Sequence, residues 1–502
     1  MKLSEKSPRV TTSASETAHN LGSTAARGAL ITLSGQGIRI LLQIAGVVVL
    51  ARLLSPHDYG LLAIVVVIIG IGEIFRDFGL SSAAVRAPEL TGGQRTNLFW
   101  INAAIGVSLG GVLFAISGPL ATAAGQIEVQ SIARAMTVIF ILNGLTTQFR
   151  AHLMRDLQFR RLAIIDVIAP AFALAVAISA ALLGWGYWSL VAQQITQALA
   201  ILVGTAVGAR WLPGLPNQNV SVRPFLRFGA NLVLSQIVNY GANNVDTAVV
   251  GFVYGPTSLG LYNRAYQLVV TPLSQIQSPV TSVAIPVLAK IQEDQRRFSA
   301  YIVRGQLALG YPISLGLVGV AVAAEPITRL MLGEQWLAAV PFLQLFAVAG
   351  IARNLAFVGY WVYVVRGLSG DLFRFSLSTG LVPVICVVVG TQWGVLGVAA
   401  GFAIAPWLTW PVSLLWLSRV TAVPTRALFT GALRIIGVAG VSAGAAFSVT
   451  IALPAMPALL SIAVTAVAIG GTVGLLCLIP TIRRDAKSLL EVGVLVKRRK
   501  GL

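Results

Sequence analysis

The chain has 502 residues, of which 56% are hydrophobic and only 11% are charged. Soluble domains normally carry about 25% charged residues, so this composition excludes a large soluble domain. In so apolar a chain, the net charge of +19 is expected to reflect membrane topology before it indicates a nucleic-acid partner.

The first 27 residues form the longest polar stretch, which is rich in Ser and Thr and carries four basic residues. Such a composition buries too little apolar surface to fold, so we expect a disordered tail. No short apolar core with a small-residue cleavage site follows the basic residues, so the pattern is not that of a signal peptide.

Apolar stretches follow one another from Gly28 to Pro480. About 20 apolar residues in a helix cross the hydrocarbon core of a bilayer. The chain is therefore predicted to be all-α, a polytopic membrane protein with about fourteen transmembrane helices. The predicted helices cover residues 28–53, 59–79, 98–118, 131–149, 162–184, 187–207, 226–253, 258–287, 303–324, 338–364, 372–391, 393–417, 428–452 and 456–479.

Basic residues mark every second connection between these helices. Of the 36 Lys and Arg residues, 30 lie in the two tails and in alternate connections. The intervening connections are short, for example 55–58 and 184–186. Because cationic loops stay on the cytoplasmic side, this alternation predicts that both termini are cytoplasmic.

The two halves of the chain resemble each other. A shift of 200 residues aligns Leu53–Leu62 with Val253–Tyr262, so that Pro56 meets Pro256 and Gly60 meets Gly260. Parallel repeats of this kind build transporter sites between two lobes. We therefore predict a disordered basic tail at 1–27, an N-lobe at 28–207, a cytoplasmic linker at 208–225, a C-lobe at 226–417, an accessory helix pair at 428–479 and a basic cytoplasmic tail at 480–502.

Polar residues form two stripes at matching positions of the repeat, each on one helix face. The first stripe is Gln36, Arg39 and Gln43, and the second is Gln236, Asn239, Asn243 and Asp246. Two matched stripes indicate a wet cavity between the lobes. The alternative is that these side chains only hydrogen-bond neighbouring helices together.

Arg39 and Arg353 lie in the middle of predicted spans, and Arg264 lies a turn or two inside the outer end of its span. An Arg at bilayer depth costs about 2.5–3.5 kcal/mol on insertion scales and usually faces protein or water. Arg39 and Arg353 have no acidic neighbour in their own helices, so we expect them to bind an anionic cargo such as a phosphate. Asp246 lies at a depth where an ion pair with Arg264, or a role in ion coupling, is expected.

Other charged and small residues are expected to serve structure. Glu73, Arg76 and Asp77 are predicted to pair with one another at the inner interface. Three pairs of glycines four residues apart predict close helix packing. These pairs are Gly106 with Gly110, Gly397 with Gly401, and Gly440 with Gly444. The tail from Thr481 to Lys500 is expected to lie on the anionic inner leaflet.

The sequence contains no motif for catalysis, a cofactor or a metal ion. It lacks a P-loop, HExxH, CxxC and a dinucleotide-binding unit, so we expect neither an enzyme nor a cofactor. His19, His57 and His152 are scattered and predict no metal site. Cys386 and Cys477 lie inside apolar spans, which favours reduced thiols.

Several segments together resemble the polysaccharide transporter family, the Wzx-like flippases of the multidrug/oligosaccharidyl-lipid/polysaccharide superfamily. The segments are LARLLSPHDYGLLAI (50–64), FRDFGLSSAAVR (75–86), LGLYNRAYQL (259–268), AIPVLAKIQEDQRRF (284–298) and AEPITRLMLGEQW (324–336). The resemblance runs from about Gly28 to Pro480 and implies a MATE/MurJ-like fold.

The same resemblance implies a flippase of the bacterial inner membrane that moves undecaprenyl-diphosphate-linked oligosaccharide repeat units outward. Exopolysaccharide, capsule or O-antigen assembly is the implied pathway, and a polysaccharide polymerase and a chain-length regulator are the implied partners. The family's cationic central cavity for the diphosphate and sugar makes Arg39 and Arg353, and then Arg264, the candidate binding residues.

Two other functions are weighed against this one. An ion-coupled multidrug exporter of the MATE type would have an acidic cavity and usually twelve helices, whereas the charges within the predicted spans are mainly cationic. A membrane-embedded glycan polymerase or ligase would carry a substantial charged outer loop. Every predicted outer loop here is short.

Overall fold

The computed structural model describes residues 36–77, 91–216, 223–453 and 456–488. Within these ranges the chain forms helices joined by turns and contains no β-strand, which confirms the predicted all-α class. The first described helix covers Gln36–Leu53, inside the first predicted span. Packing divides the chain into two compact units, and each is described by itself.

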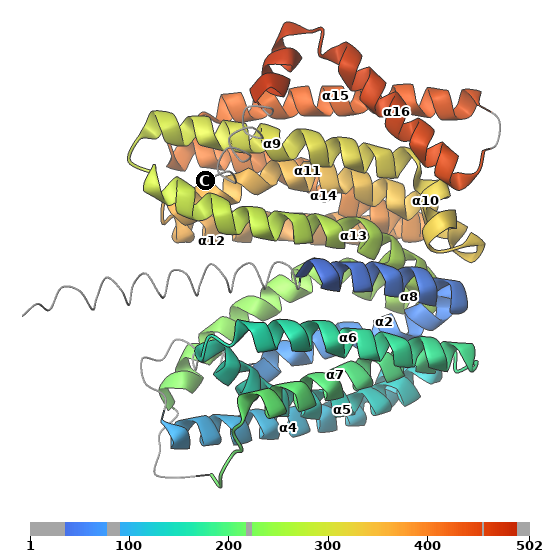
Figure 1. Cartoon of the computed structure of the whole chain (residues 1–502), viewed down its shortest axis with the longest axis vertical. Coiled ribbons are helices and arrows are strands. Elements are labelled where there is room, and N and C mark those ends of the chain that lie inside the picture. The colour runs from blue at the N-terminus through green and yellow to red at the C-terminus, as the bar shows by residue number, and fades with distance from the viewer. Residues whose placement is uncertain (1–35, 78–90, 217–222, 454–455, 489–502) are drawn as a thin grey trace, which may run out of the picture. The chain divides into compact units, whose positions relative to one another are not determined.

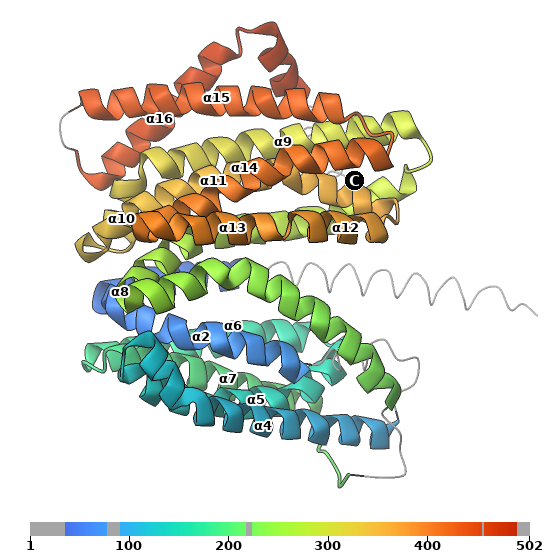
Figure 2. The same ribbon diagram turned by 180° about the vertical axis from the view of Figure 1, so that it is seen from behind.

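Unit 1 contains the residues up to Leu54 together with Ile68–Thr122 and Gln126–Val238. Its helices are the first described helix, the later part of α2 (Pro56–Asp77), α4 (Gly92–Ala124), α5 (Glu128–Arg155), α6 (Phe159–Leu182), α7 (Tyr187–Ala209) and the beginning of α8 (Arg223–Lys290). Figures 1 and 2 show α4, α5, α6 and α7 side by side, and α7 packs against both α5 and α6.

Unit 2 contains Ser55–Val67, Ala123–Gly125 and the chain from Asn239 onward. Its elements are the rest of α8, α9 (Gln295–Val322), α10 (Ala324–Met331), η1 (Glu334–Ala339), α11 (Val340–Val365), α12 (Ser369–Thr379), α13 (Leu381–Gly390), η2 (Thr391–Trp393), α14 (Gly394–Val420), α15 (Thr425–Ala452) and α16 (Ala458–Leu476). Here α11 packs against α9 and α14, and α15 packs against α9 and α16. Figure 2 shows α12 and α13 in line with each other beside α14.

Eleven stretches of the described chain are long and apolar enough to cross a membrane. One of them, Ser369–Val420, covers two predicted spans, and α8 covers two more. Gly255 interrupts α8 with a φ of 81°, at the connection that the sequence predicted between residues 253 and 258. The membrane-spanning character is confirmed, whereas the count of fourteen and the two lobes stay predictions.

The repeated Pro–Gly motifs pack directly against each other within unit 2. A Cβ atom on Gly60 would overlap the carbonyl oxygen of Pro256, and one on Gly260 would overlap the carbonyl oxygen of Pro56. The contact is therefore reciprocal between the two copies. Glycine is required at both positions because each backbone approaches the other too closely for any side chain.

Two of the three predicted glycine pairs are helix contacts. Gly106 and Gly110 lie against backbone carbonyls of α5, and Gly397 and Gly401 lie against the backbone of α13. The prediction for Gly440 and Gly444 is wrong, because within the described chain no atom outside α15 lies within 4 Å of a Cβ placed on either. The spacing alone does not reveal which helix face meets a partner.

A short helix follows α16 over residues 480–488 and is held by one buried acid. Asp485 is 8% exposed and accepts hydrogen bonds from Arg434 Nε at 2.9 Å and from the Tyr311 hydroxyl at 2.9 Å. A second Arg434 nitrogen lies 3.2 Å from the other carboxylate oxygen. This carboxylate thus fixes the helix to α9 and α15, while Arg483 and Lys487 are exposed.

Candidate functional site

Unit 1 contains a pocket of about 230 Å³, here named the Arg39 pocket. Its walls come from the first described helix, from the C-terminal end of α5 and from the beginning of α6. The lining includes Gln36, Arg39, Arg150, Met154, Leu162 and Asp166. Two residues of the first predicted polar stripe therefore do line a pocket, whereas Gln43 is exposed elsewhere on the same helix.

The Arg39 pocket holds two guanidinium groups and one carboxylate. Arg150 meets Asp166 in a two-pronged contact, with nitrogen–oxygen distances of 2.7 and 2.8 Å. Such a bidentate pair holds the planar guanidinium in one orientation. One positive charge remains in excess, and Arg39 is the exposed member.

Sequence reasoning attributed Arg150 to membrane topology and did not include it in a site. The only signal was Asp166, an acid near the start of an otherwise apolar span. The pairing joins residues on different helices, so the spacing within either helix does not predict it.

Unit 2 contains a larger pocket of about 490 Å³, here named the Asp246 pocket. It lies among α8, α11, α12, α13 and α14. The lining includes Asn243, Asp246, Gln277, Arg353, Phe402 and Trp410. Three candidates from the sequence, Asn243, Asp246 and Arg353, are thus brought together.

Of the other candidates on α8, Gln236 is partly exposed in unit 1, and the side chain of Asn239 lies outside the described part. These two residues are not placed in either pocket by the described structure. Their contribution to a site stays a prediction.

Asp246 is almost fully buried, at 2% exposure, and accepts a hydrogen bond of 2.5 Å from the Tyr262 hydroxyl. Arg353 lines the same pocket as this carboxylate. The Arg353 guanidinium carbon is also 5.6 Å from the centre of the Phe402 ring. Although Arg353 has no acidic neighbour in its own helix, α8 provides one.

Arg264 lies elsewhere in unit 2. Its guanidinium carbon is 3.7 Å from the centre of the Tyr59 ring, which in turn packs edge-on against Trp336 at 5.5 Å. Arg264 lines neither pocket. The expected pair with Asp246 is wrong, because Tyr262 and Arg353 are the neighbours of Asp246 and Arg264 is stabilised by an aromatic face.

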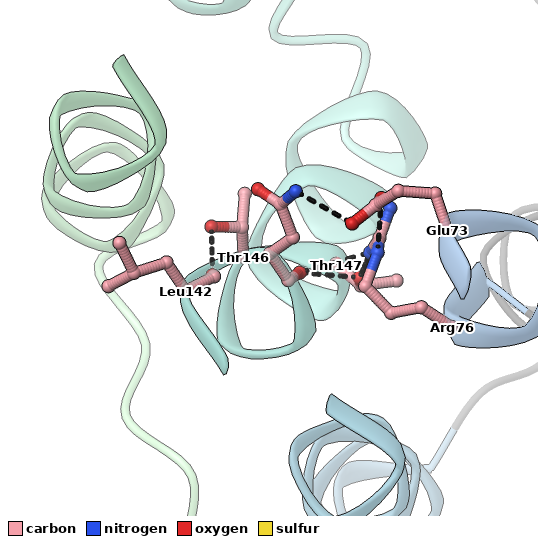
Figure 3. Close-up of polar contacts among 6 residues, drawn as sticks. Glu73, Arg76, Leu142, Thr146 and Thr147 are labelled. Carbon is pink, nitrogen blue, oxygen red and sulfur yellow. Dashed lines mark hydrogen bonds and ion pairs between the residues drawn. The ribbon is translucent and has the colours of Figure 1, made fainter. Parts of the chain in front are cut away.

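A polar network joins α2 to α5 within unit 1 (Figure 3). Arg76 Nε donates to Glu73 at 2.6 Å and another Arg76 nitrogen donates to the Asn143 carbonyl at 3.0 Å and to the Thr147 hydroxyl. Asn143 Nδ2 completes the network by donating to Glu73 at 2.9 Å. The predicted pairing of Glu73 with Arg76 is confirmed. The Arg76 side chain is only 17% exposed, and it connects two helices instead of extending toward the membrane–water interface.

Cys386 and Cys477 are free, as expected. Among the described residues, no three His, Cys, Asp or Glu side chains are grouped so as to hold a metal ion. The chemistry of both pockets is therefore that of guanidinium, carboxylate, amide, hydroxyl and aromatic groups.

Residues 49–341, more than half of the chain, match the family model described as polysaccharide biosynthesis protein. The chain belongs to this family. The resemblance noted in the sequence is thereby confirmed.

Several curated relatives carry related descriptions. The lipopolysaccharide biosynthesis protein WzxC of Escherichia coli is 28% identical over 364 residues, covering 70% of this chain and 73% of WzxC. The teichuronic acid biosynthesis protein TuaB of Bacillus subtilis is 28% identical over 64% of this chain and 68% of TuaB. The succinoglycan biosynthesis transport protein ExoT of Rhizobium meliloti is 28% identical over 61% of this chain and 62% of ExoT.

Solved structures establish the fold. The lipid II flippase MurJ in an inward closed conformation matches with a TM-score of 0.68 and 14% identity, covering 90% of this chain and 99% of MurJ. An inward-facing MATE-family multidrug transporter matches with a TM-score of 0.56 and 16% identity, covering 80% of this chain and 99% of the transporter. The predicted MATE/MurJ-like fold is confirmed. The chain is a multi-pass membrane protein with this fold.

Proposed function

We propose that this protein is a flippase that exports undecaprenyl-diphosphate-linked oligosaccharide repeat units by alternating access. The pathway is the assembly of an exopolysaccharide, a capsule or an O-antigen. The descriptions of WzxC, TuaB and ExoT support a role in surface polysaccharide assembly. The match to MurJ supports a fold suited to moving a lipid-linked cargo.

The observation that carries the proposal is the cationic excess of the Arg39 pocket. A diphosphate presents several charged oxygens, and guanidinium groups bind such oxygens through two parallel hydrogen bonds. Arg39 is exposed in this pocket, and Arg150 is held beside it by Asp166. Asp166 acts as an internal counter-ion that keeps Arg150 oriented when no cargo is present.

The remaining candidates take different parts in this proposal. Five amide side chains hydrogen-bond the cargo along its path, namely Gln36, Gln43, Gln236, Asn239 and Asn243. Arg353 contributes from the pocket that it shares with Asp246, and Asp246 is also the candidate ion-coupling residue. Arg264 has a packing role only, because it lies on the Tyr59 ring and lines neither pocket.

Orientation and partners complete the proposal. The alternation of basic connections supports a cytoplasmic location of both termini. A polysaccharide polymerase and a chain-length regulator act on the cargo after its export. The lipid-linked oligosaccharide and the bilayer are the immediate partners.

The test is a deletion strain from which lipid-linked precursors are extracted and surface polysaccharide is measured. We expect precursor to accumulate and polysaccharide to disappear, with recovery on expression of the wild-type gene. Arg39→Ala removes a charged hydrogen-bond donor worth about 1.5–3 kcal/mol, so it should lower export by roughly 10- to 100-fold while the protein still reaches the membrane.

Arg297→Ala is the matched control, because this side chain is 79% exposed in the first turn of α9 and lines neither pocket. Unchanged precursor and polysaccharide in the deletion strain would overturn the proposal. Increased drug susceptibility of that strain would then favour the multidrug-exporter alternative. Full export by Arg39→Ala would contradict the role of the Arg39 pocket and would leave the proposed flippase function standing.

A further inference from the structure

Three hydrogen-bond donors that line the Asp246 pocket have no partner among the described residues. They are Nε2 of Gln277, the hydroxyl of Tyr363 and Nε1 of Trp410. Tyr363 and Trp410 are each only 3% exposed. Buried donors are nearly always satisfied in folded proteins, so three around one cavity indicate a ligand with acceptor oxygens.

The same wall also offers acceptors. Three hydroxyl groups on this wall each donate to a backbone carbonyl of their own helix. The distances are 2.8 Å for Thr379, 3.1 Å for Thr409 and 2.6 Å for Ser413. Because each hydrogen is already engaged, these oxygens present lone pairs to other donors. A group that both donates and accepts, such as an alcohol hydroxyl, matches this combination.

Aromatic rings supply flat apolar surface around the cavity. Tyr363 and Phe375 stack with ring centres 6.3 Å apart and an angle of 18° between their planes. Phe402 lies beside Arg353, with 5.6 Å between its ring centre and the guanidinium carbon. Ring faces carry negative quadrupole charge and receive the weakly positive C–H face of a pyranose.

Charge separates this pocket from the Arg39 pocket. The lining of this pocket contains one acidic and one basic side chain, Asp246 and Arg353, so its formal charges cancel. A diphosphate would meet the Asp246 carboxylate here, and a hydrocarbon chain would leave the three donors unsatisfied. A neutral, hydroxyl-rich ligand avoids both penalties, and a cavity of about 490 Å³ lies within the usual range for small-molecule sites.

We propose that the Asp246 pocket is a carbohydrate subsite that binds a pyranose residue of the repeat unit. The groups that bind it are Gln277, Tyr363, Trp410, Asp246 and Arg353. This inference rests on the proposed function and deepens it, since it assigns the sugar to unit 2 and leaves the diphosphate to the Arg39 pocket. Arg353 then recognises hydroxyl groups of the sugar rather than phosphate.

The experiment measures binding of two probes to the purified full-length protein in detergent. One probe is the oligosaccharide released by mild acid from the host's own lipid-linked precursor. The other is farnesyl diphosphate, which carries a diphosphate but no sugar. Tyr363→Phe and Gln277→Met each remove one donor with little change of shape, and Tyr187→Phe on α7 is the control outside both pockets.

We expect Tyr363→Phe and Gln277→Met each to weaken oligosaccharide binding by roughly five- to tenfold, as for the loss of one hydrogen bond. Farnesyl diphosphate binding should be unchanged in both variants and weakened by Arg39→Ala. Tyr187→Phe should bind both probes as the wild type does.

Unchanged oligosaccharide affinity in both donor variants would overturn the subsite. Wild-type protein that binds farnesyl diphosphate but no oligosaccharide would overturn it too, while the flippase proposal would stand. Wild-type protein that binds neither probe would count against both. Oligosaccharide binding without diphosphate binding would support the subsite and contradict the diphosphate role of the Arg39 pocket.

Discussion

Arg150, Arg264 and Arg353 each lie among apolar helices, and each has a different kind of partner. Arg150 forms a bidentate ion pair with Asp166, Arg264 lies on the Tyr59 ring, and Arg353 lies beside Asp246 and Phe402. A charge at this depth is tolerated only when protein or water stabilises it. The kind of partner decides whether the guanidinium can still receive a ligand, and stacking on a buried ring makes Arg264 the weakest candidate.

Asp485 allows a direct measurement of how strongly one buried carboxylate stabilises the fold. It accepts hydrogen bonds from Arg434 and Tyr311, so Asp485→Ala should leave both donors without their acceptor. Arg434 is 35% exposed and can recover water, so we expect a loss of about 1–3 kcal/mol. The measurement is the thermal unfolding midpoint of the purified protein, which should fall by several degrees.

Asp371→Ala is the matched control for this prediction. Asp371 pairs with Arg374 at 3.7 Å, and the side chains of Arg374 and Asp371 are 75% and 27% exposed. Exposed pairs contribute little to stability, so the midpoint should stay within about 1 °C of the wild type. Equal midpoints for Asp485→Ala and the wild type would show that the helix over residues 480–488 is not held by this carboxylate.

At the level of helices, close backbone approach decides which glycines matter. The first turns of α2 and the Pro256–Gly260 turn of α8 meet through reciprocal glycine–carbonyl contacts. Gly440 on α15 has the same four-residue spacing to its partner glycine as the packed pairs, yet no atom of a neighbouring described helix lies near it. The same four-residue spacing of glycines therefore accompanies close helix packing in two pairs and an open helix face in the third.

Gly60→Ala and Gly440→Ala form a matched pair that tests this difference. The methyl group of Gly60→Ala would overlap the Pro256 carbonyl, and overpacking of this kind typically costs 1–3 kcal/mol or more. We expect a lower unfolding midpoint and less folded protein in membranes. Gly440→Ala adds a methyl group to an open face and improves helix propensity by up to about 1 kcal/mol, so its midpoint should be unchanged or higher.

An equal effect of the two substitutions would contradict the reciprocal contact. Gly260→Ala offers an independent check, since it places a methyl group against the Pro56 carbonyl on the other side of the same contact. It should resemble Gly60→Ala rather than Gly440→Ala.

For the molecule as a whole, the charge alternation makes a prediction about orientation. A fluorescent protein fused after Leu502 should fold and fluoresce, because the positive-inside rule places the C-terminus in the cytoplasm. Alkaline phosphatase fused at Trp185, in the short connection between α6 and α7, should be active because that connection is predicted to face outward. The reverse pattern of activities would contradict the predicted topology.

Much of the fold was predictable because it depends on local composition. Long apolar runs predicted the all-α membrane class, and Gly255 interrupts α8 where a connection was predicted. Two of the three glycine pairs were also predicted correctly. The resemblance of short turn motifs predicted the family, which a match over residues 49–341 confirms.

The candidate site was only partly predictable. Arg39 and Gln36 share a face of one helix, and periodicity within that helix was enough to group them. Arg150 was missed because its role depends on Asp166 from another helix. The buried donors of Tyr363 and Trp410 gave no signal, since aromatic residues in an apolar span are ordinary packing residues until their polar atoms are found without partners.

Apolar length, helix periodicity and the distribution of Lys and Arg are properties of the chain alone, and they were sufficient for the fold class and the expected topology. The family followed from the resemblance of short sequence motifs. The partners of Asp246, Arg264 and Arg353 depend on which helix faces are brought together. The face at Gly440 is open because no described helix packs against it. Contacts between residues far apart in sequence arise only when the helices pack, because side-chain chemistry and spacing within one helix do not specify the neighbouring helix.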